Sequence, residues 1–598
     1  PAFTPKVWAQ VHSEGAAAYP TQSRTMNRGV SNPGCSRFGM TDAFVPFQPN
    51  GPKETTKAGL DDAILFGATK PDPGGLPLGT LEYFEFSRFY NTPGTPFEAT
   101  LNLRSGEGTL APGTVELTLP SGWTADATTK SVGAVSENET TKVTFTITPA
   151  PNADVDRNYK IAARYRTGSA TGYTDDVVRL VAPVEGRYKR WGKWAEYDNW
   201  LTNTAPAAQR IGRSTAVAPI VVGETIDFPV VVHNWSDVPQ SGSVSLTLGA
   251  NLSSPETTKS YGTLAPGEET TVTFQVTSNH TSQPSSQPSI TVTTTNSTHG
   301  PGSETVSMSV VPKTTIPQAP ATPTLDGVES PGEYPGEALD LGRIWEGGSR
   351  CTPDGIDCGT APGVEPGSPN STYAKVAWRD DALYFFINVR DEFQSYAVTP
   401  EECVAHWLAD SVEILIDPRG RASENAMDTA HTFKLGIFPF TNDPDNYNGN
   451  GVNGPCWSRD ADNHQGYSTG PLAATVPNAP NAPGVEVKST ARWVGSNETT
   501  VDHSYEGGGY QLEVKIPMSV LPAAIDPERM ALNITPYDND NTAAAGTTTL
   551  RHIDNSARLA WSTFGSVQSD PYRWGRARLE GYTPPPDRPT TPGDPILA

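Results

Sequence analysis

CVAHWLADSVEILID, residues 403–417, changes character halfway. Over Ser411–Asp417, apolar side chains at Val412 and every second position to Ile416 alternate with mostly polar ones. Period-two alternation with β-branched residues is typical of a half-buried strand. Trp407 precedes this strand, at the expected rim of a sheet. A rim indole offers a flat apolar face for a sugar ring, although the same residue could equally be a core side chain.

The composition predicts an all-β, multi-domain protein. A length of 598 residues suggests roughly four domains. Short alternating segments punctuated by Gly and Pro recur, and no long stretch has helical periodicity. The net charge of −23 argues against nucleic acid and anionic membrane surfaces as partners. No apolar run reaches the roughly 18 residues that a membrane span needs.

The cysteine pattern favours a secreted protein. Five cysteines are too few for a disulfide scaffold. Cys351 and Cys358 could form a disulfide across a short loop, and Cys403 and Cys456 could pair across one domain. Cys35 then has no predicted partner. We predict a Cys403–Cys456 disulfide, with Cα atoms within about 7 Å. The chain begins at residue 1 without an initiator methionine or a signal-type segment, so we expect a processed product.

A repeat with a constant offset of 129 residues predicts two immunoglobulin-like β-sandwiches, at 91–182 and 210–312. The repeat places Phe145 and Phe274 in equivalent core positions. Outward positions are mostly Thr and Ser, which indicates spacers rather than binding faces. The repeated segments are GTVELTL at 113–119 and GSVSLTL at 242–248, TTKSVG at 128–133 and TTKSYG at 257–262, and VTFTIT at 143–148 and VTFQVT at 272–277.

The aromatic segment between the sandwiches has two interpretations. It contains Trp191, Trp194 and Trp200, and it would either wedge the sandwiches into a fixed angle or form a second sugar-stacking platform. The full predicted division is an N-terminal segment of unclear fold or the end of a larger domain (1–90), the first sandwich (91–182), the aromatic linker (183–209), the second sandwich (210–312), a proline linker (313–324), a larger β-sandwich (325–582) and a disordered tail (583–598).

Two parts of the chain resemble known families. LAPGTVELTLPSGWT and VTFTITPAP in the first sandwich resemble the NPCBM-associated domain of alpha-galactosidases. The segments LDGVESPGEYPGEALDLG, AKVAWRDDALYFFINVRDE, WLADSVEILIDPRG, HTFKLGIFP, YQLEVKIPMSVL, MALNITPYDNDN and RLAWSTFGSVQSDPYRWGRARLEGY, in this order, resemble the family 9 carbohydrate-binding modules. This second resemblance implies a β-sandwich with a sugar site at one rim and at least one structural calcium.

The family's sugar site carries over in part. The resemblance implies that Trp407 is one of two clamp tryptophans and that Glu413 accepts hydrogen bonds from vicinal hydroxyls. Lys434 stands where the family can use arginine, which loses bidentate geometry. The second clamp position falls near Gln568, so the clamp is half-built. The candidates for its other face are Trp457 and Tyr572.

Two acidic loops are candidates for the implied calcium. DPDNYNGNG places Asp443 and Asp445 before glycines, and YDNDN offers Asp538 and Asp540. Closely spaced oxygens suit a hard cation, but both loops would equally form ordinary Asx-turns.

No catalytic motif occurs, and residues 1–90 are too short for a typical catalytic domain. The architecture resembles the C-terminal region of secreted PIG-L (LmbE-like) N-acetylglucosamine deacetylases, whose His-Pro-Asp-Asp metal motif is absent here. Enzymatic activity therefore stays undecided. The alternatives are a secreted carbohydrate-binding protein with a glycan partner, the non-catalytic part of a hydrolase whose catalytic domain lies on another piece of chain, and a structural surface or assembly protein.

Overall fold

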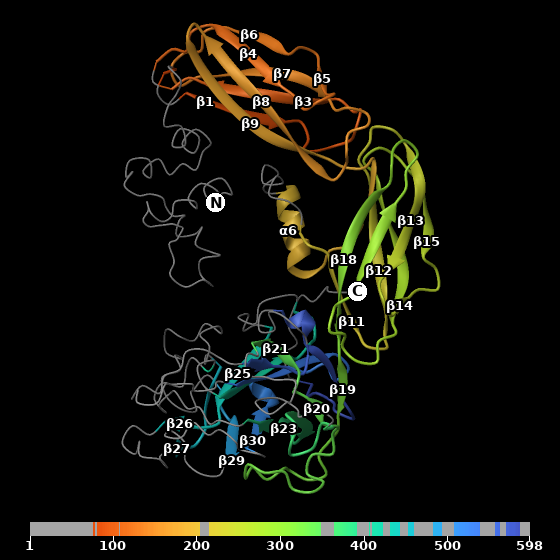
Figure 1. The fold of residues 1–598 in the computed structure, drawn as a ribbon, viewed down its shortest axis with the longest axis vertical. Helices are drawn as coiled ribbons and strands as arrows, with labels where there is room; N and C mark the ends of the chain where they lie inside the picture. The colour runs from red at the N-terminus through yellow and green to blue at the C-terminus, as the bar shows by residue number, and fades with distance from the viewer. Residues whose placement is uncertain are drawn as a thin grey trace.

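Three β-sandwiches follow one another along a curved path in the computed structural model (Figure 1). The account below concerns residues 76–77, 80–106, 108–203, 214–347, 364–391, 406, 410–422, 431–442, 452–459, 482–492, 508–538, 557–562 and 570–586, which are those the structure describes.

The first sandwich packs a four-stranded sheet on a five-stranded one. Alternate residues of each strand point into the shared core, as the period of two predicts. In sheet order, the strands are β1 (Leu81–Phe86), β3 (Phe97–Arg104), β7 (Thr140–Thr148) and β5 (Thr124–Ala125), and β2 (Tyr90–Asn91), β9 (Ala170–Leu180), β8 (Arg157–Thr167), β4 (Gly113–Thr118) and β6 (Thr129–Val132).

The second sandwich repeats this strand order, element for element. In sheet order, its strands are β10 (Val184–Tyr188), β12 (Thr225–Asn234), β16 (Glu269–Ser278) and β14 (Leu252–Ser253), and β11 (Val217–Val221), β18 (Gly302–Val311), β17 (Ser289–Thr294), β13 (Gln240–Leu248) and β15 (Thr258–Leu264).

The register confirms the duplication predicted from the sequence. Phe145 on β7 lies opposite Ala99, and Phe274 on β16 lies opposite Phe228, with the same 129-residue offset on both strands. Both phenylalanines are fully buried. The two copies therefore share one core arrangement.

Several predicted boundaries are wrong. β1 lies before residue 91, yet it pairs along its whole length with β3 of the first sandwich. β10 lies in the predicted aromatic linker, yet it is a strand of the second sandwich. Each is the first strand of its copy, so each domain begins earlier than the repeated segments alone indicated.

The aromatic linker also contains the one α-helix of the described residues, α6 (Gly192–Asn203). Its sequence lacks a clear apolar face, which is why helical periodicity did not predict it. It is inserted between β10 and β11, where the first copy has a short connection. Neither α6 nor any shorter helix among the described residues has the length and apolarity to cross a bilayer.

The C-terminal module packs an eight-stranded sheet on a five-stranded one. The larger sheet has the main order β19 (Lys313–Ile316), β33 (Gly575–Leu579), β31 (Met530–Asp538), β24 (Ser411–Asp417), β25 (Phe433–Phe438) and β28 (Cys456–Ser458). β32 (Ala557–Leu559) also pairs with β31, and β21 (Ile344–Gly347) pairs with β32. The smaller has β20 (Leu339–Asp340), β22 (Tyr373–Arg379), β23 (Ala382–Arg390), β30 (Gly509–Pro517) and β29 (Glu486–Ala491). A short hairpin joins β26 (Thr441–Asn442) and β27 (Val452–Asn453).

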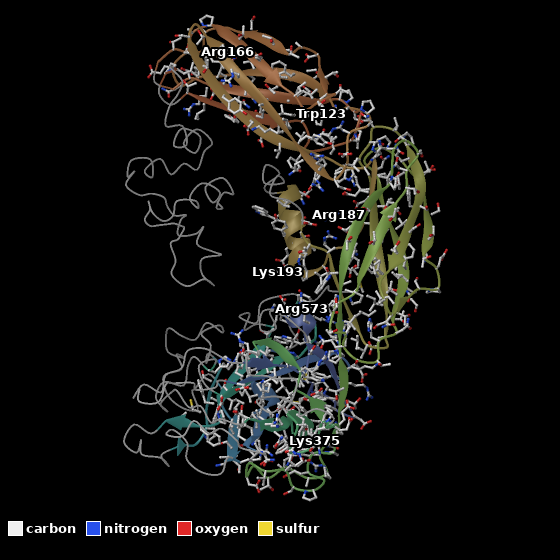
Figure 2. The ribbon with its side chains drawn as sticks, in the orientation of Figure 1. Trp123, Arg166, Arg187, Lys193, Lys375 and Arg573 are labelled. Carbon is white, nitrogen blue, oxygen red and sulfur yellow. The ribbon has the colours of Figure 1, made fainter. Side chains whose placement is uncertain are left out.

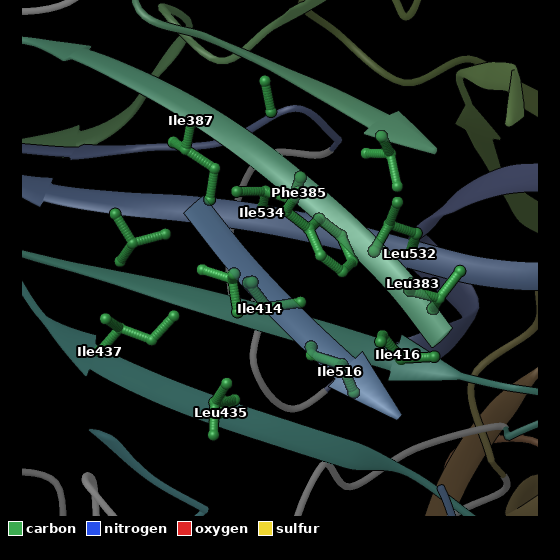
Figure 3. Packing of buried hydrophobic residues seen from close by; sticks show 14 of the residues in the cluster. Leu383, Phe385, Ile387, Ile414, Ile416, Leu435, Ile437, Ile516, Leu532 and Ile534 are labelled. Atoms are coloured by element: carbon green, nitrogen blue, oxygen red, sulfur yellow. The ribbon is translucent and has the colours of Figure 1, made fainter. Parts of the chain in front are cut away.

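The core of this module lies between its two sheets (Figure 3). Ile414 and Ile416 of β24 meet Leu383, Phe385 and Ile387 of the smaller sheet in a fully buried cluster. β24 is buried on both faces, so the expected half-buried strand is instead fully enclosed. β19 falls within the predicted proline linker, but it pairs in parallel with β33.

A glycine at the start of the fourth strand of each copy permits close approach of its neighbour. A Cβ on Gly113 would collide with the Arg166 carbonyl oxygen, and a Cβ on Gly242 would lie 2.5 Å from that of Thr295. We therefore expect Gly113→Ala to lower the free energy of unfolding of the first sandwich by about 1–3 kcal/mol, because backbone must shift to accept the methyl group.

Gly133→Ala is the matched control, since a Cβ at Gly133 meets nothing within 4 Å. Calorimetry of the full chain measures both variants. Equal midpoints for the two would show that the neighbouring strand yields at no cost.

Candidate functional site

Several predicted site residues lie outside the described residues: Trp407, Asp443, Asp445, Asp540, Cys351, Cys358 and Cys403. The structure does place Glu413, Lys434, Trp457, Tyr572, Asp538 and Cys456.

Glu413 and Lys434 are brought together on the outer face of the larger sheet. Glu413 is on β24 and Lys434 on the neighbouring β25, and the Lys434 Nζ lies 2.8 Å from the Glu413 Oε1. Strand alternation explains the location, because Val412 and Ile414 occupy the opposite, core-facing side of β24. The ammonium offsets the charge of the carboxylate, which a buried position requires.

Three further residues, which the sequence did not reveal, complete this charged cluster. The Tyr537 hydroxyl donates to the Glu413 Oε2 at 3.0 Å, and the Thr535 hydroxyl lies 3.3 Å from the same oxygen. His406 Nε2 lies 3.3 Å from the Glu413 Oε1, and the His406 ring packs edge-on against Tyr537. We call Glu413, Lys434, His406, Tyr537 and Thr535 the Glu413 cluster.

The Glu413 cluster is enclosed, whereas the resemblance implied that the Glu413 carboxylate accepts hydrogen bonds from sugar hydroxyls. The exposed fractions of Glu413, Lys434 and His406 are 0%, 1% and 1%. The His406 carbonyl accepts a hydrogen bond from the Ser411 hydroxyl at 2.7 Å, so His406 is tied to the first residue of β24. The cluster thus holds His406 and does not itself form an exposed sugar-contacting wall.

The two candidates for a second clamp face both pack against other apolar or aromatic side chains. Trp457 is on β28 opposite Ile437, and its ring packs into the core between the sheets. Tyr572 packs against Trp191 and Trp194 of the segment around α6. Trp457 thus lies in the core of the module, and the assignment of either residue to the clamp stays a prediction, since Trp407 lies outside the described residues. The sequence around Trp457 is polar and does not show how β28 pairs with β25. That pairing places Trp457 opposite Ile437, on the side of the sheet that faces the core.

Asp538 belongs to a group of three buried aspartates. Asp391 follows β23, Asp410 precedes β24, and Asp538 ends β31. One carboxylate oxygen from each lies within 4.8 Å of the others. Burial, with these three carboxylates close by, raises the pKa of the Tyr510 hydroxyl well above its ordinary value. Three oxygen ligands at this spacing form a donor set that suits a hard cation such as Ca²⁺.

Sequence reasoning missed Asp391 and Asp410 because only strand pairing brings them to Asp538. A usable signal was present, since each is an acidic residue at the end of an apolar strand segment. Cys456 is disulfide-bonded. The other four cysteines lie outside the described residues, so its pairing with Cys403 stays a prediction.

We expect Lys434→Met to lower the free energy of unfolding of the C-terminal module by about 3–5 kcal/mol, because it removes the cation from a buried carboxylate. Glu413→Gln combined with Lys434→Met should recover much of this loss. Chemical denaturation measures both.

Lys515→Met is the control, since the Lys515–Glu486 pair has a similar length of 2.6 Å but is exposed. It should cost less than about 1 kcal/mol. Equal losses for Lys434→Met and Lys515→Met would contradict the role given to burial.

Comparisons with known proteins identify two portions of the chain. No curated protein matches it. Among solved structures, red sea bream transglutaminase is similar at 14% identity over 47% of this chain and 34% of that one, with a TM-score of 0.22. Salmonella alpha-2-macroglobulin reacted with methylamine is similar at 12% identity over 59% and 20% of the two chains, with a TM-score of 0.20. This chain thus covers about a third or less of either protein, and these likenesses carry no argument about function.

The family matches agree with the resemblances drawn from the sequence. Residues 91–166, in the first sandwich, match the family described as the NPCBM-associated, NEW3 domain of alpha-galactosidase. Residues 360–441, which include Trp407, Glu413 and Lys434, match the family described as carbohydrate family 9 binding domain-like.

Proposed function

We propose that this protein binds carbohydrate through its C-terminal module, at the end of β24 where Trp407 precedes the strand. The observation that carries the proposal is the match of residues 360–441 to the carbohydrate family 9 binding domain-like family. Trp407, Glu413 and Lys434 all lie within it. Trp407 supplies the apolar stacking face, as a sugar ring requires.

The Glu413 cluster has a positioning role in this proposal. His406 directly precedes Trp407 in sequence, and it is held by Glu413 at 3.3 Å and by the Ser411 hydroxyl on its carbonyl. Asp410 and Ser411 anchor the other end of the same short segment, since both are buried. Holding the residues on either side of a stacking side chain limits the conformational entropy that is lost when a sugar binds, which favours affinity.

We further propose that the protein is secreted, that it anchors to a polysaccharide, and that this chain is not itself catalytic. The disulfide at Cys456 supports an oxidising compartment. A second candidate, a region of a secreted PIG-L-type deacetylase or other hydrolase acting with a separate catalytic domain, rests on the order of the modules alone. The sequence of the natural precursor decides between the two.

We expect Trp407→Ala to abolish glycan binding and to leave the thermal midpoint nearly unchanged, because one stacking face provides most of the contact. Binding of the native chain should be weak, on the order of tens of micromolar to millimolar. A glycan array followed by titration calorimetry on the best ligand measures both properties.

Trp200→Ala, on the half-buried side of α6, is the matched control and should keep full binding. A large fall in the midpoint of Trp407→Ala, of the size that about 3–5 kcal/mol produces, would establish Trp407 as a core residue instead.

We also propose that Asp391, Asp410 and Asp538 hold a structural Ca²⁺ ion. Three carboxylates that are 2%, 1% and 3% exposed repel one another at this spacing, and a divalent cation relieves that repulsion. Ca²⁺ takes about six to eight oxygens, so backbone carbonyls and water would complete the set. The ion would join the smaller sheet, through Asp391, to the larger one.

Removal of calcium with EDTA should lower the thermal midpoint of the C-terminal module, because an ion that binds only the folded state stabilises it by about 2.7 kcal/mol at a hundredfold excess over its Kd. Asp538→Asn should abolish this difference and calcium retention in equilibrium dialysis. Asp380→Asn, at an aspartate 64% exposed, should leave both unchanged. Identical midpoints of the native chain in calcium and EDTA would reject the site.

A further inference from the structure

We infer that the second sandwich and the C-terminal module unfold as one cooperative unit, joined by a latch in which Tyr572 packs against Trp191 and Trp194. The inference concerns the contact between the two modules, and it holds whatever ligand the C-terminal module takes.

The connection between the second sandwich and the C-terminal module is one residue long. β18 of the second sandwich ends at Val311, and β19 of the C-terminal sheet begins at Lys313. The residue between them, Pro312, accepts a hydrogen bond on its carbonyl from the Arg576 N–H at 2.8 Å. β19 then continues as a parallel partner of β33. A connection made of paired strands transmits orientation, unlike the semi-rigid linker that its prolines suggested.

The latch itself is aromatic. The Tyr572 ring lies 5.3 Å from that of Trp194 and 6.0 Å from that of Trp191, measured between ring centroids, and both contacts are edge-on at 77° and 82°. The two tryptophans lie 4.9 Å apart. Edge-on rings at these distances attract one another beyond the area they bury. Figure 2 shows Arg573, the neighbour of Tyr572, at the side of the C-terminal module nearest Lys193 on α6.

The tryptophan side of the latch is fixed to the second sandwich. The Trp191 indole N–H donates to the Val217 carbonyl of β11 at 2.8 Å. The preceding residue, Arg190, is 8% exposed in its side chain and pairs with Glu304 of β18 at 2.6 Å. Tyr572 and Trp194 both pack onto the core cluster of this sandwich. Tyr572 therefore packs against side chains that are bonded to the second sandwich.

A second contact lies apart from the latch. The Arg343 guanidinium of the C-terminal module donates to the Oε1 and the carbonyl of Gln283, at 3.3 and 3.1 Å. Gln283 is itself buried in a loop of the second sandwich. The junction between the first two sandwiches has contacts of its own, since Tyr90 lies 5.1 Å from Trp235 between ring centroids and the buried Val181 and Ala182 connect β9 to β10. Its Arg88–Asp237 ion pair, however, is exposed by 31% and 63%. We place the boundary between cooperative units there.

Hydrogen exchange of the full chain, read by mass spectrometry, tests the coupling. Ile414→Val removes one methyl group from the C-terminal core, far from the latch. If the modules unfold together, the most protected amides of β12 and β16 in the second sandwich should exchange roughly 2- to 10-fold faster in this variant. Amides of β3 and β7 in the first sandwich should stay unchanged.

The same substitution in a Tyr572→Ala background separates coupling from direct contact. There, the effect of Ile414→Val should remain within the C-terminal module, and a Tyr572→Phe background should restore its transmission because the ring is kept. If Ile414→Val in the otherwise native chain speeds exchange only within the C-terminal module, the two modules are independent and the inference is overturned. If Ile414→Val speeds exchange in the second sandwich equally with and without the Tyr572 ring, the aromatic contact does not couple the two modules.

Discussion

Burial of β24 on both faces constrains the side chains and the register of the strands beside it. Its inner face contributes to the apolar core, but its outer face carries two carboxylates, on Glu413 and Asp417, that have to be satisfied inside the protein. Asp417 accepts hydrogen bonds from four backbone N–H groups at 419–422, although burial still raises the pKa of its carboxyl. Glu413 depends instead on side chains of β25 and β31, so the register of three strands is tied to one charge.

The two copies of the duplicated sandwich differ in the connection between their first two strands. Both copies have the same strand order, and the first copy joins its first two strands through three residues, 87–89. The second copy carries α6 at the same place. The insertion adds Trp191 and Trp194 at a sheet edge, and the C-terminal module packs Tyr572 onto them. Trp191 and Trp194 therefore contact the C-terminal module, whereas the sequence predicted that the aromatic segment would either wedge the two sandwiches into a fixed angle or form a sugar-stacking platform.

The sequence predicted the strands and core positions that follow from local periodicity. It missed the features that depend on contacts between distant segments. Alternation identified β24 and the repeated strands, and the constant offset placed Phe145 and Phe274 correctly, because side-chain direction in a strand follows position directly. α6 has no apolar stripe, so its helix depends on packing. The Asp391 group and the inward direction of Trp457 depend on pairing between strands distant in sequence. The ends of the apolar segments mark Asp391 and Asp410 in the sequence, but no single window shows which strands pair and so bring them to Asp538.

Stability alone does not account for the charges at this end of the module. A buried ion pair such as Lys434–Glu413 can often be replaced by apolar residues of similar volume without loss, because desolvation offsets most of the attraction. Three buried aspartates whose carboxylate oxygens lie within 4.8 Å of one another also have charges that the protein must offset. Both groups lie where β24 begins and β31 ends, since Asp410 and Glu413 flank the start of one strand and Tyr537 and Asp538 end the other. Costly polar arrangements concentrate where structure is held for function, and here His406 of one group and Asp410 of the other flank Trp407 in the sequence.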